Sequence, residues 1–89
     1  MRNIPQELKN IRAENRKKAA LRNAENVGAT RWAIQHFKER GDKEMQDEFV
    51  TQLKSCEEIL NTHIGSGVIT PEQANESIVN GFSGGEEWL

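Results

Sequence analysis

Residues 42–65, with the sequence DKEMQDEFVTQLKSCEEILNTHIG, carry the clearest structural signal in this chain of 89 residues. At about 100° per residue, apolar and weakly polar side chains fall on one arc of a helix. They are Met45, Phe49, Leu53, Cys56, Ile59, Leu60, His63 and Ile64. Asp42 suits the N-cap, and Gly65 or Gly67 suits the end. The stretch therefore predicts an amphipathic helix over residues 43–64.

A helix is also expected on the N-terminal side of this one. Gly41, directly before Asp42, is a stop signal for a preceding helix. A turn this short is typical of two antiparallel helices. Residues 29–40 and 43–64 are therefore predicted to form an antiparallel helical hairpin.

A short third helix is expected after the hairpin. Thr70, Pro71 and Gln73 have the spacing of a capping box with proline at the first helical position. The helix is predicted to run to about residue 79, with Asn80 and Gly81 at its end. The fold class is thus all-α: an antiparallel helical hairpin, a basic N-terminal helix, a short C-terminal third helix and a flexible acidic tail.

The N-terminal region begins with an apolar stripe that soon fails. Ile4, Leu8 and Ile11 share one helical face, but the next positions on it are polar: Asn15, Lys18 and Arg22. Residues 12–26 contain strong helix formers without a consistent apolar side. This pattern predicts a solvated helix, or one that becomes ordered against a partner. Gly28 predicts a kink or break within residues 26–30.

The chain is accordingly divided into three parts. Residues 1–28 are the basic helix or arm, residues 29–82 are the hairpin with its capping helix, and residues 83–89 are the flexible tail. The second long helix is nearly twice as long as residues 29–40. Its C-terminal half is therefore predicted to pack on residues before Gly28, on the third helix or on another subunit. The small number of large apolar side chains favours the last option, a homo-oligomer.

Charge is distributed very unevenly along the chain. Residues 1–40 hold ten Lys and Arg against four Asp and Glu, a net charge of 10 − 4 = +6. Residues 41–89 hold two against ten, a net charge of 2 − 10 = −8. A basic arm beside an acidic body predicts either attraction between the two halves or a cationic arm for an anionic partner.

The basic candidates for binding lie in the N-terminal part of the chain. They are Arg12, Arg16, Lys17, Lys18 and Arg22. Facing a nucleic acid, these side chains would neutralise phosphates, and binding would depend steeply on salt. The alternative is a solvated helix face, or a stripe paired with the acidic surfaces of the second helix or of a neighbouring subunit. Glu14 and Lys18 also have the spacing of an ion pair within the helix.

Signs of catalysis and metal binding are weak. Cys56 and His63 share the apolar stripe but lie two helical turns apart, so they are more typical of core residues than of a nucleophile and its base. Two histidines and one cysteine do not reproduce a zinc ligand set. We expect no catalytic residues, no metal ligands, no cofactor and no enzymatic activity.

The sequence also bears on compartment. A single cysteine excludes a disulfide within the chain. No apolar run has the length of a signal peptide or a membrane span. A cytoplasmic location with no membrane partner is expected.

The expected function is a small non-enzymatic interaction protein, a regulator or inhibitor, that self-associates and binds a macromolecular partner. A nucleic-acid-binding accessory protein is the alternative, and an oligomer holding a small anionic ligand between subunits is a second. The expected interface residues are Leu8, Ile11, Met45, Phe49, Leu53, Leu60, Trp88 and Leu89. The tail ending in Trp88 and Leu89 suits docking on a partner, or folding back on its own chain.

Overall fold

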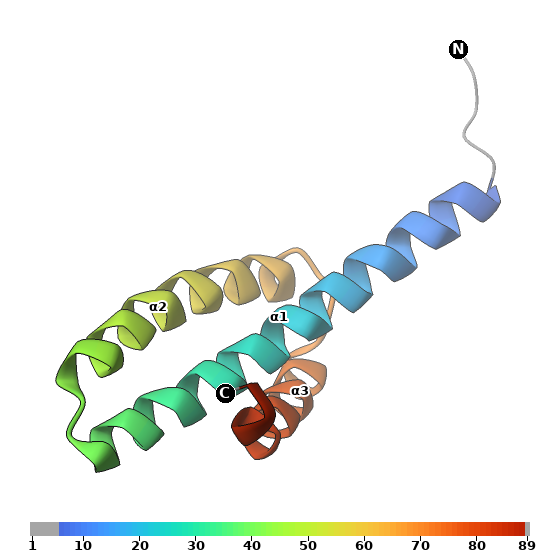
Figure 1. Ribbon diagram of the computed structural model, residues 1–89. Coiled ribbons are helices and arrows are strands. Elements are labelled where there is room, and N and C mark those ends of the chain that lie inside the picture. Colours follow the sequence, from blue (N-terminus) through green and yellow to red (C-terminus); the bar gives the residue numbers. More distant parts are fainter. Residues whose placement is uncertain (1–5, 89) are drawn as a thin grey trace.

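Three α-helices and a terminal 3-10 turn form the part of the protein that the computed structural model describes, residues 6–88. The helices α1, α2 and α3 span Gln6–Arg40, Lys43–Gly65 and Pro71–Ser83, and the 3-10 turn η1 spans Gly85–Trp88. The predicted all-α class is confirmed, with no strand among these residues. α1 forms the long axis, while α2 and α3 lie on different sides of it and hardly touch each other (Figure 1).

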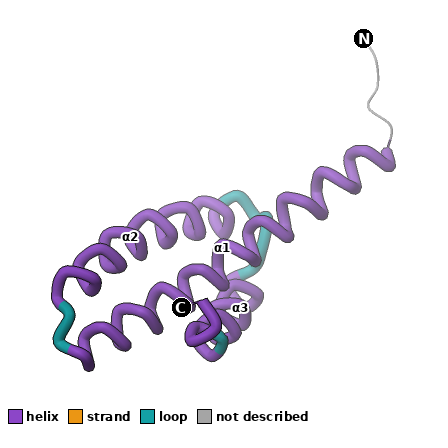
Figure 2. Tube along the Cα trace, viewed as in Figure 1, coloured by secondary structure: helices purple, strands orange, loops and turns teal. Residues whose placement is uncertain are grey.

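Local capping sets where α2 and α3 begin. The Asp42 side chain accepts a hydrogen bond from the Met45 N–H at 3.2 Å, as expected of an N-cap. The predicted capping box is confirmed: the Gln73 N–H donates to Thr70 Oγ1 at 3.1 Å, and the Thr70 N–H donates to Gln73 Oε1 at 3.0 Å. The two connections that these caps close are short (Figure 2). Gly41 adopts a φ of +74°, which favours glycine in the first of them.

The expected break in the first helix is wrong. α1 continues without interruption through residues 26–30, across the predicted boundary between residues 28 and 29. Gly28 lies where α1 crosses α3, and a Cβ atom there would overlap the carbonyl oxygen of Ile78. Its lack of a side chain serves a close approach of two backbones, so the tertiary contact overrides the weak helix propensity of glycine.

The end predicted for the third helix is also wrong, for the same reason. α3 passes through Gly81 and reaches Ser83. A Cβ atom at Gly81 would overlap the carbonyl oxygen of Glu25, so this glycine forms the other half of the crossing. Residues 85–88, predicted as a flexible tail, form the turn η1. Gly85 is buried in this turn, and a Cβ atom there would lie 2.6 Å from Cγ of Trp32.

The core lies around the C-terminal two thirds of α1 and is built largely from small side chains. The buried apolar residues are Ala20, Ala24, Val27, Ala29, Ala33, Leu60, Ile69 and Ala74. Val27 is the largest side chain that is fully buried. None of the described side chains before Ala20 belongs to this core. From Leu8 to Ala19, α1 thus contributes no side chain to the buried core.

Candidate interaction arm

The N-terminal third of α1 projects beyond the body of the protein. Every side chain from Leu8 to Ala19 is exposed, and we call this segment the arm. In Figure 1 it extends past the ends of α2 and α3, within a molecule that measures 58 × 22 × 21 Å. An isolated helix of this length is marginal in water, so the arm depends on the supported part of α1 to nucleate it. A partner that covers the arm would stabilise it further.

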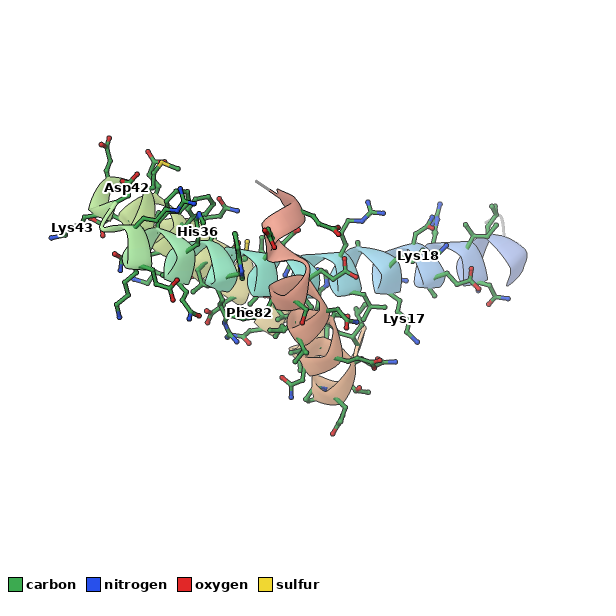
Figure 3. All side chains as sticks on the ribbon, turned by 60° about the horizontal axis from the view of Figure 1, so that its bottom comes forward. Lys17, Lys18, His36, Asp42, Lys43 and Phe82 are labelled. Atoms are coloured by element: carbon green, nitrogen blue, oxygen red, sulfur yellow. The ribbon has the colours of Figure 1, made fainter. Side chains whose placement is uncertain are left out.

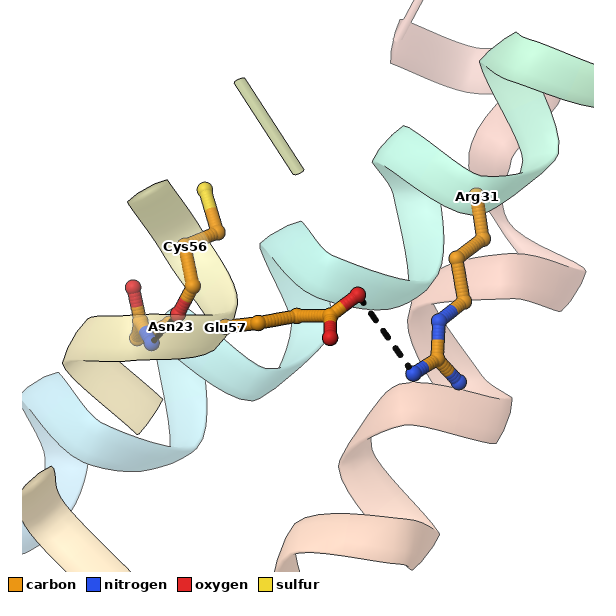
Figure 4. A network of polar contacts seen from close by, with 4 residues as sticks. All are labelled: Asn23, Arg31, Cys56 and Glu57. Atoms are coloured by element: carbon orange, nitrogen blue, oxygen red, sulfur yellow. Dashed lines mark hydrogen bonds and ion pairs between the residues drawn. The ribbon is translucent and has the colours of Figure 1, made fainter. Parts of the chain in front are cut away.

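The arm is strongly cationic. It carries Lys9, Arg12, Arg16, Lys17 and Lys18 against one carboxylate, Glu14, a net charge of 5 − 1 = +4. The expected ion pair between Glu14 and Lys18 is not formed. Among the side chains that the structure describes, those of residues 8–87, one ion pair is present. It joins Arg31 and Glu57 at 3.8 Å and lies in the body (Figure 4).

The cations occupy two different faces of the arm. At about 100° per residue, Lys9, Arg16 and Lys17 share one side of the helix, and Arg12 lies at the edge of that side, between Arg16 and Leu8. We call this side the cationic face. Lys18 lies about 100° from Lys17, and the two side chains lie on different sides of α1 (Figure 3). Lys18 shares its side with Leu8 and Ile11, which are 46% and 51% exposed.

The predicted site residues thus separate into two groups. Arg12, Arg16, Lys17 and Lys18 come together on the arm with Leu8 and Ile11, and Arg22 is exposed where the arm joins the body. The predicted interface residues of α2 lie elsewhere. Met45, Phe49 and Leu53 are half-buried, and Leu60 is buried in the core of its own chain, so it is not accessible to a partner.

Aromatic rings provide part of the cover on α2. Phe37 of α1 and Phe49 of α2 stack with their centroids 5.6 Å apart. Trp32 stacks on His36 at 4.8 Å, within α1 itself. The predicted contacts of the tail are only partly described: the backbone of η1 returns to Trp32, whereas the Trp88 side chain and Leu89 lie outside the described part of the chain.

The thiol of Cys56 has the wrong surroundings for an activated nucleophile. Burial raises its pKa, and the nearby Glu57 carboxylate raises it further. A higher pKa lowers the thiolate fraction at neutral pH, and the thiolate is the reactive form. The backbone carbonyl of Cys56 accepts a hydrogen bond from Asn23 Nδ2 at 3.0 Å, which ties α2 to α1 (Figure 4).

Sequence analysis missed a second exposed surface, on α3. Val79 and Phe82 are 62% and 39% exposed, and Phe82 lines a pocket with Trp32 and His36 of α1. Glu72 and Asn75 lie on the same side of α3 and are also exposed. The signal was available in the spacing of these four residues, which matches that of the interrupted stripe on the arm.

Comparison with known proteins adds no assignment, since no family model, curated protein or solved structure matches the chain. Within residues 6–88, no helix combines the length and the apolar character needed to cross a membrane. The same residues contain no group of three His, Cys, Asp or Glu side chains arranged to hold a metal ion.

Proposed function

We propose that this protein is a small non-enzymatic interaction protein, a regulator or inhibitor that self-associates and binds an anionic macromolecular partner through its arm. The observation that carries the proposal is the complete exposure of residues 8–19 as a helix with a net charge of +4. A solvated helix of this kind gains little stability from its own chain. Covering it with a partner of opposite charge offsets that weakness and speeds encounter.

The cationic face formed by Lys9, Arg16 and Lys17 is the proposed contact for this partner. None of the three forms an ion pair within residues 6–88, so each is available for a carboxylate or phosphate group. The acidic body repels an anionic partner and thereby favours contact at the arm. Such charge patterning contributes more to specificity and association rate than to affinity.

Reversing the charge of the cationic face should abolish partner recovery. We expect a chain with Lys9, Arg16 and Lys17 each changed to Glu to recover its partner from a cell extract at least about tenfold less well than the unmodified chain. The matched control reverses three exposed cations of the body, Lys38, Lys43 and Lys54, which gives the same net charge. Quantitative mass spectrometry of the captured proteins measures the difference.

Equal losses in the two variants would mean that net charge alone drives capture, and the proposal would then be wrong. Equal recovery by all three chains would contradict it as well. Circular dichroism of each variant checks that the helices persist.

Nucleic acid is the second candidate partner, because the cations of the arm surround much of the helix. We expect a mobility shift with duplex DNA at about 50 mM salt, and a slope of about −3 for log affinity against log salt if the cationic face contacts three phosphates. The variant with the cationic face reversed should show no shift. No shift by the unmodified chain at about 50 mM salt would exclude nucleic acid and leave an acidic protein as the partner.

A further inference from the structure

We propose that the exposed face of α3 is the docking site for the arm of a second copy of this chain, bound antiparallel. This inference rests on the self-association included in the proposed function and names the two surfaces involved. The first surface, the arm stripe, consists of Leu8, Ile11, Asn15 and Lys18. The second surface, the α3 stripe, consists of Glu72, Asn75, Val79 and Phe82. All eight side chains are exposed.

The two stripes have the same spacing. In each, the second, third and fourth residues follow the first by three, seven and ten positions. This is the spacing of alternating a and d positions in a heptad repeat, which places the four side chains along one seam. Each stripe is about 15 Å long at 1.5 Å per residue, so neither extends beyond the other.

An antiparallel alignment pairs chemically matched residues at every level of the seam. Leu8 faces Phe82 and Ile11 faces Val79, which buries the large exposed apolar side chains of both surfaces. At the next level Asn15 faces Asn75, and the two amides can hydrogen-bond to each other. A single pair of this kind fixes register in helical pairs at a cost in stability.

Oppositely charged residues pair at the other end of the seam and along one of its edges. Lys18 faces Glu72 at the last level. Arg12 and Glu76 flank the seam on the same edge, between the same two levels, and both are exposed. The alignment therefore joins two cations to two carboxylates. The segment from α3 through η1 favours this contact, since residues 71–88 contain four Glu and no Lys or Arg.

The arm of the same molecule cannot occupy this surface. The arm is continuous with α1, and α3 is held against α1 by the crossing of Gly28 and Gly81. Ala74 and Ser77 are buried, and Glu72, Asn75 and Val79 lie on the other side of α3. Phe82 lies at the edge of that side, where it lines a pocket with Trp32 and His36 of α1. Pairing of two arms is also disfavoured, because an antiparallel pair would place Lys18 against Leu8 and bring the cations of both arms together.

A charge exchange tests the contact. We expect the arm variant, Arg12→Glu with Lys18→Glu, to self-associate at least about tenfold more weakly than the unmodified chain at ~50 mM salt, where exposed charges are weakly screened. The α3 variant, Glu72→Lys with Glu76→Lys, should be weakened to a similar degree. An equimolar mixture of the two variants should associate nearly as strongly as the unmodified chain, because both charge pairs are then restored with exchanged signs.

Sedimentation equilibrium at protein concentrations of ~10–500 µM measures the mass of each chain and of the mixture. This range suits the weak association expected of a contact smaller than a standard interface. The matched control, Lys9→Glu with Lys17→Glu, changes the net charge equally on the cationic face and should leave self-association within about twofold. Circular dichroism checks that α3 remains helical in the α3 variant. This check is needed because the Glu72 carboxylate also stabilises the N-terminus of α3.

Three outcomes would overturn the inference. A mixture no stronger than its components, or an α3 variant that associates as well as the unmodified chain, would show that the arm docks elsewhere, on another arm for example. An unmodified chain that stays monomeric throughout the range would remove both this contact and the proposed self-association. Binding of the anionic partner would not be affected by this result, because it is tested separately by reversing the charge of the cationic face.

Discussion

A single added methyl group at Gly28 or Gly81 is expected to lower the free energy of unfolding by about 3 kcal/mol. Alanine normally stabilises a helix by about 1 kcal/mol relative to glycine, so the expected sign is the reverse of the usual one. The reason is the crossing of α1 and α3, where a Cβ atom at either position would overlap a backbone carbonyl oxygen of the facing helix. Backbone cannot rotate away as a flexible side chain does, so the helices must separate and uncover the core around Val27 and Ala74.

Gly65→Ala is the matched control for both substitutions. Gly65 is also helical, but no atom outside the adjoining backbone of its own helix lies within 4 Å of the position its Cβ would take. We expect this variant to be as stable as the unmodified chain, or more stable by up to about 1 kcal/mol. Urea unfolding followed by circular dichroism measures all three. If Gly28→Ala and Gly81→Ala gain stability as Gly65→Ala does, the close crossing is wrong.

The same glycines show which features of the fold could not be predicted from the sequence. Gly41, Asp42 and the capping box at Thr70 act through neighbours a few residues away, so the sequence alone located the starts of α2 and α3. Gly28 and Gly81 were interpreted by the same local rules and predicted a break and a helix end. Their role is a contact between residues fifty or more positions apart, and no local pattern distinguishes such a glycine from a helix breaker.

Of the two surfaces in the candidate site, only the arm was predicted from the sequence. Interruption of the apolar stripe after Ile11 agrees with the exposure of residues 8–19. The prediction of a solvated helix is wrong from Ala20 onward, because Ala20, Ala24 and Val27 are buried in the core. The exposed stripe on α3, which we propose as the complement of the arm, was not predicted. Which side of α3 is buried depends on the crossing at Gly81, which turns Glu72, Asn75 and Val79 toward solvent.

The apolar side of α2 was expected to need cover from another subunit, and α1 supplies much of that cover. The facing part of α1 is rich in small residues such as Ala24 and Ala33, which lets α2 approach closely. Small side chains also limit how much surface each contact buries. Leu60 is the one residue of α2 that is buried in the core, and the stability of the α1–α2 contact should depend on it more than on any neighbour.

Leu60→Ala should lower the free energy of unfolding by about 3 kcal/mol, whereas Ile59→Ala should change it by less than about 0.5 kcal/mol. The two residues are adjacent on α2 and lose similar volumes, but Leu60 is 4% exposed and Ile59 is 51% exposed. A chain of this size has only about 3–5 kcal/mol of stability to lose, so Leu60→Ala should be largely unfolded near physiological temperature. Thermal and urea unfolding at low protein concentration compare the two without a contribution from self-association. Equal losses from the two substitutions would mean that Ile59 is covered in solution, and the exposed side of α2 would then have to be counted as an interface.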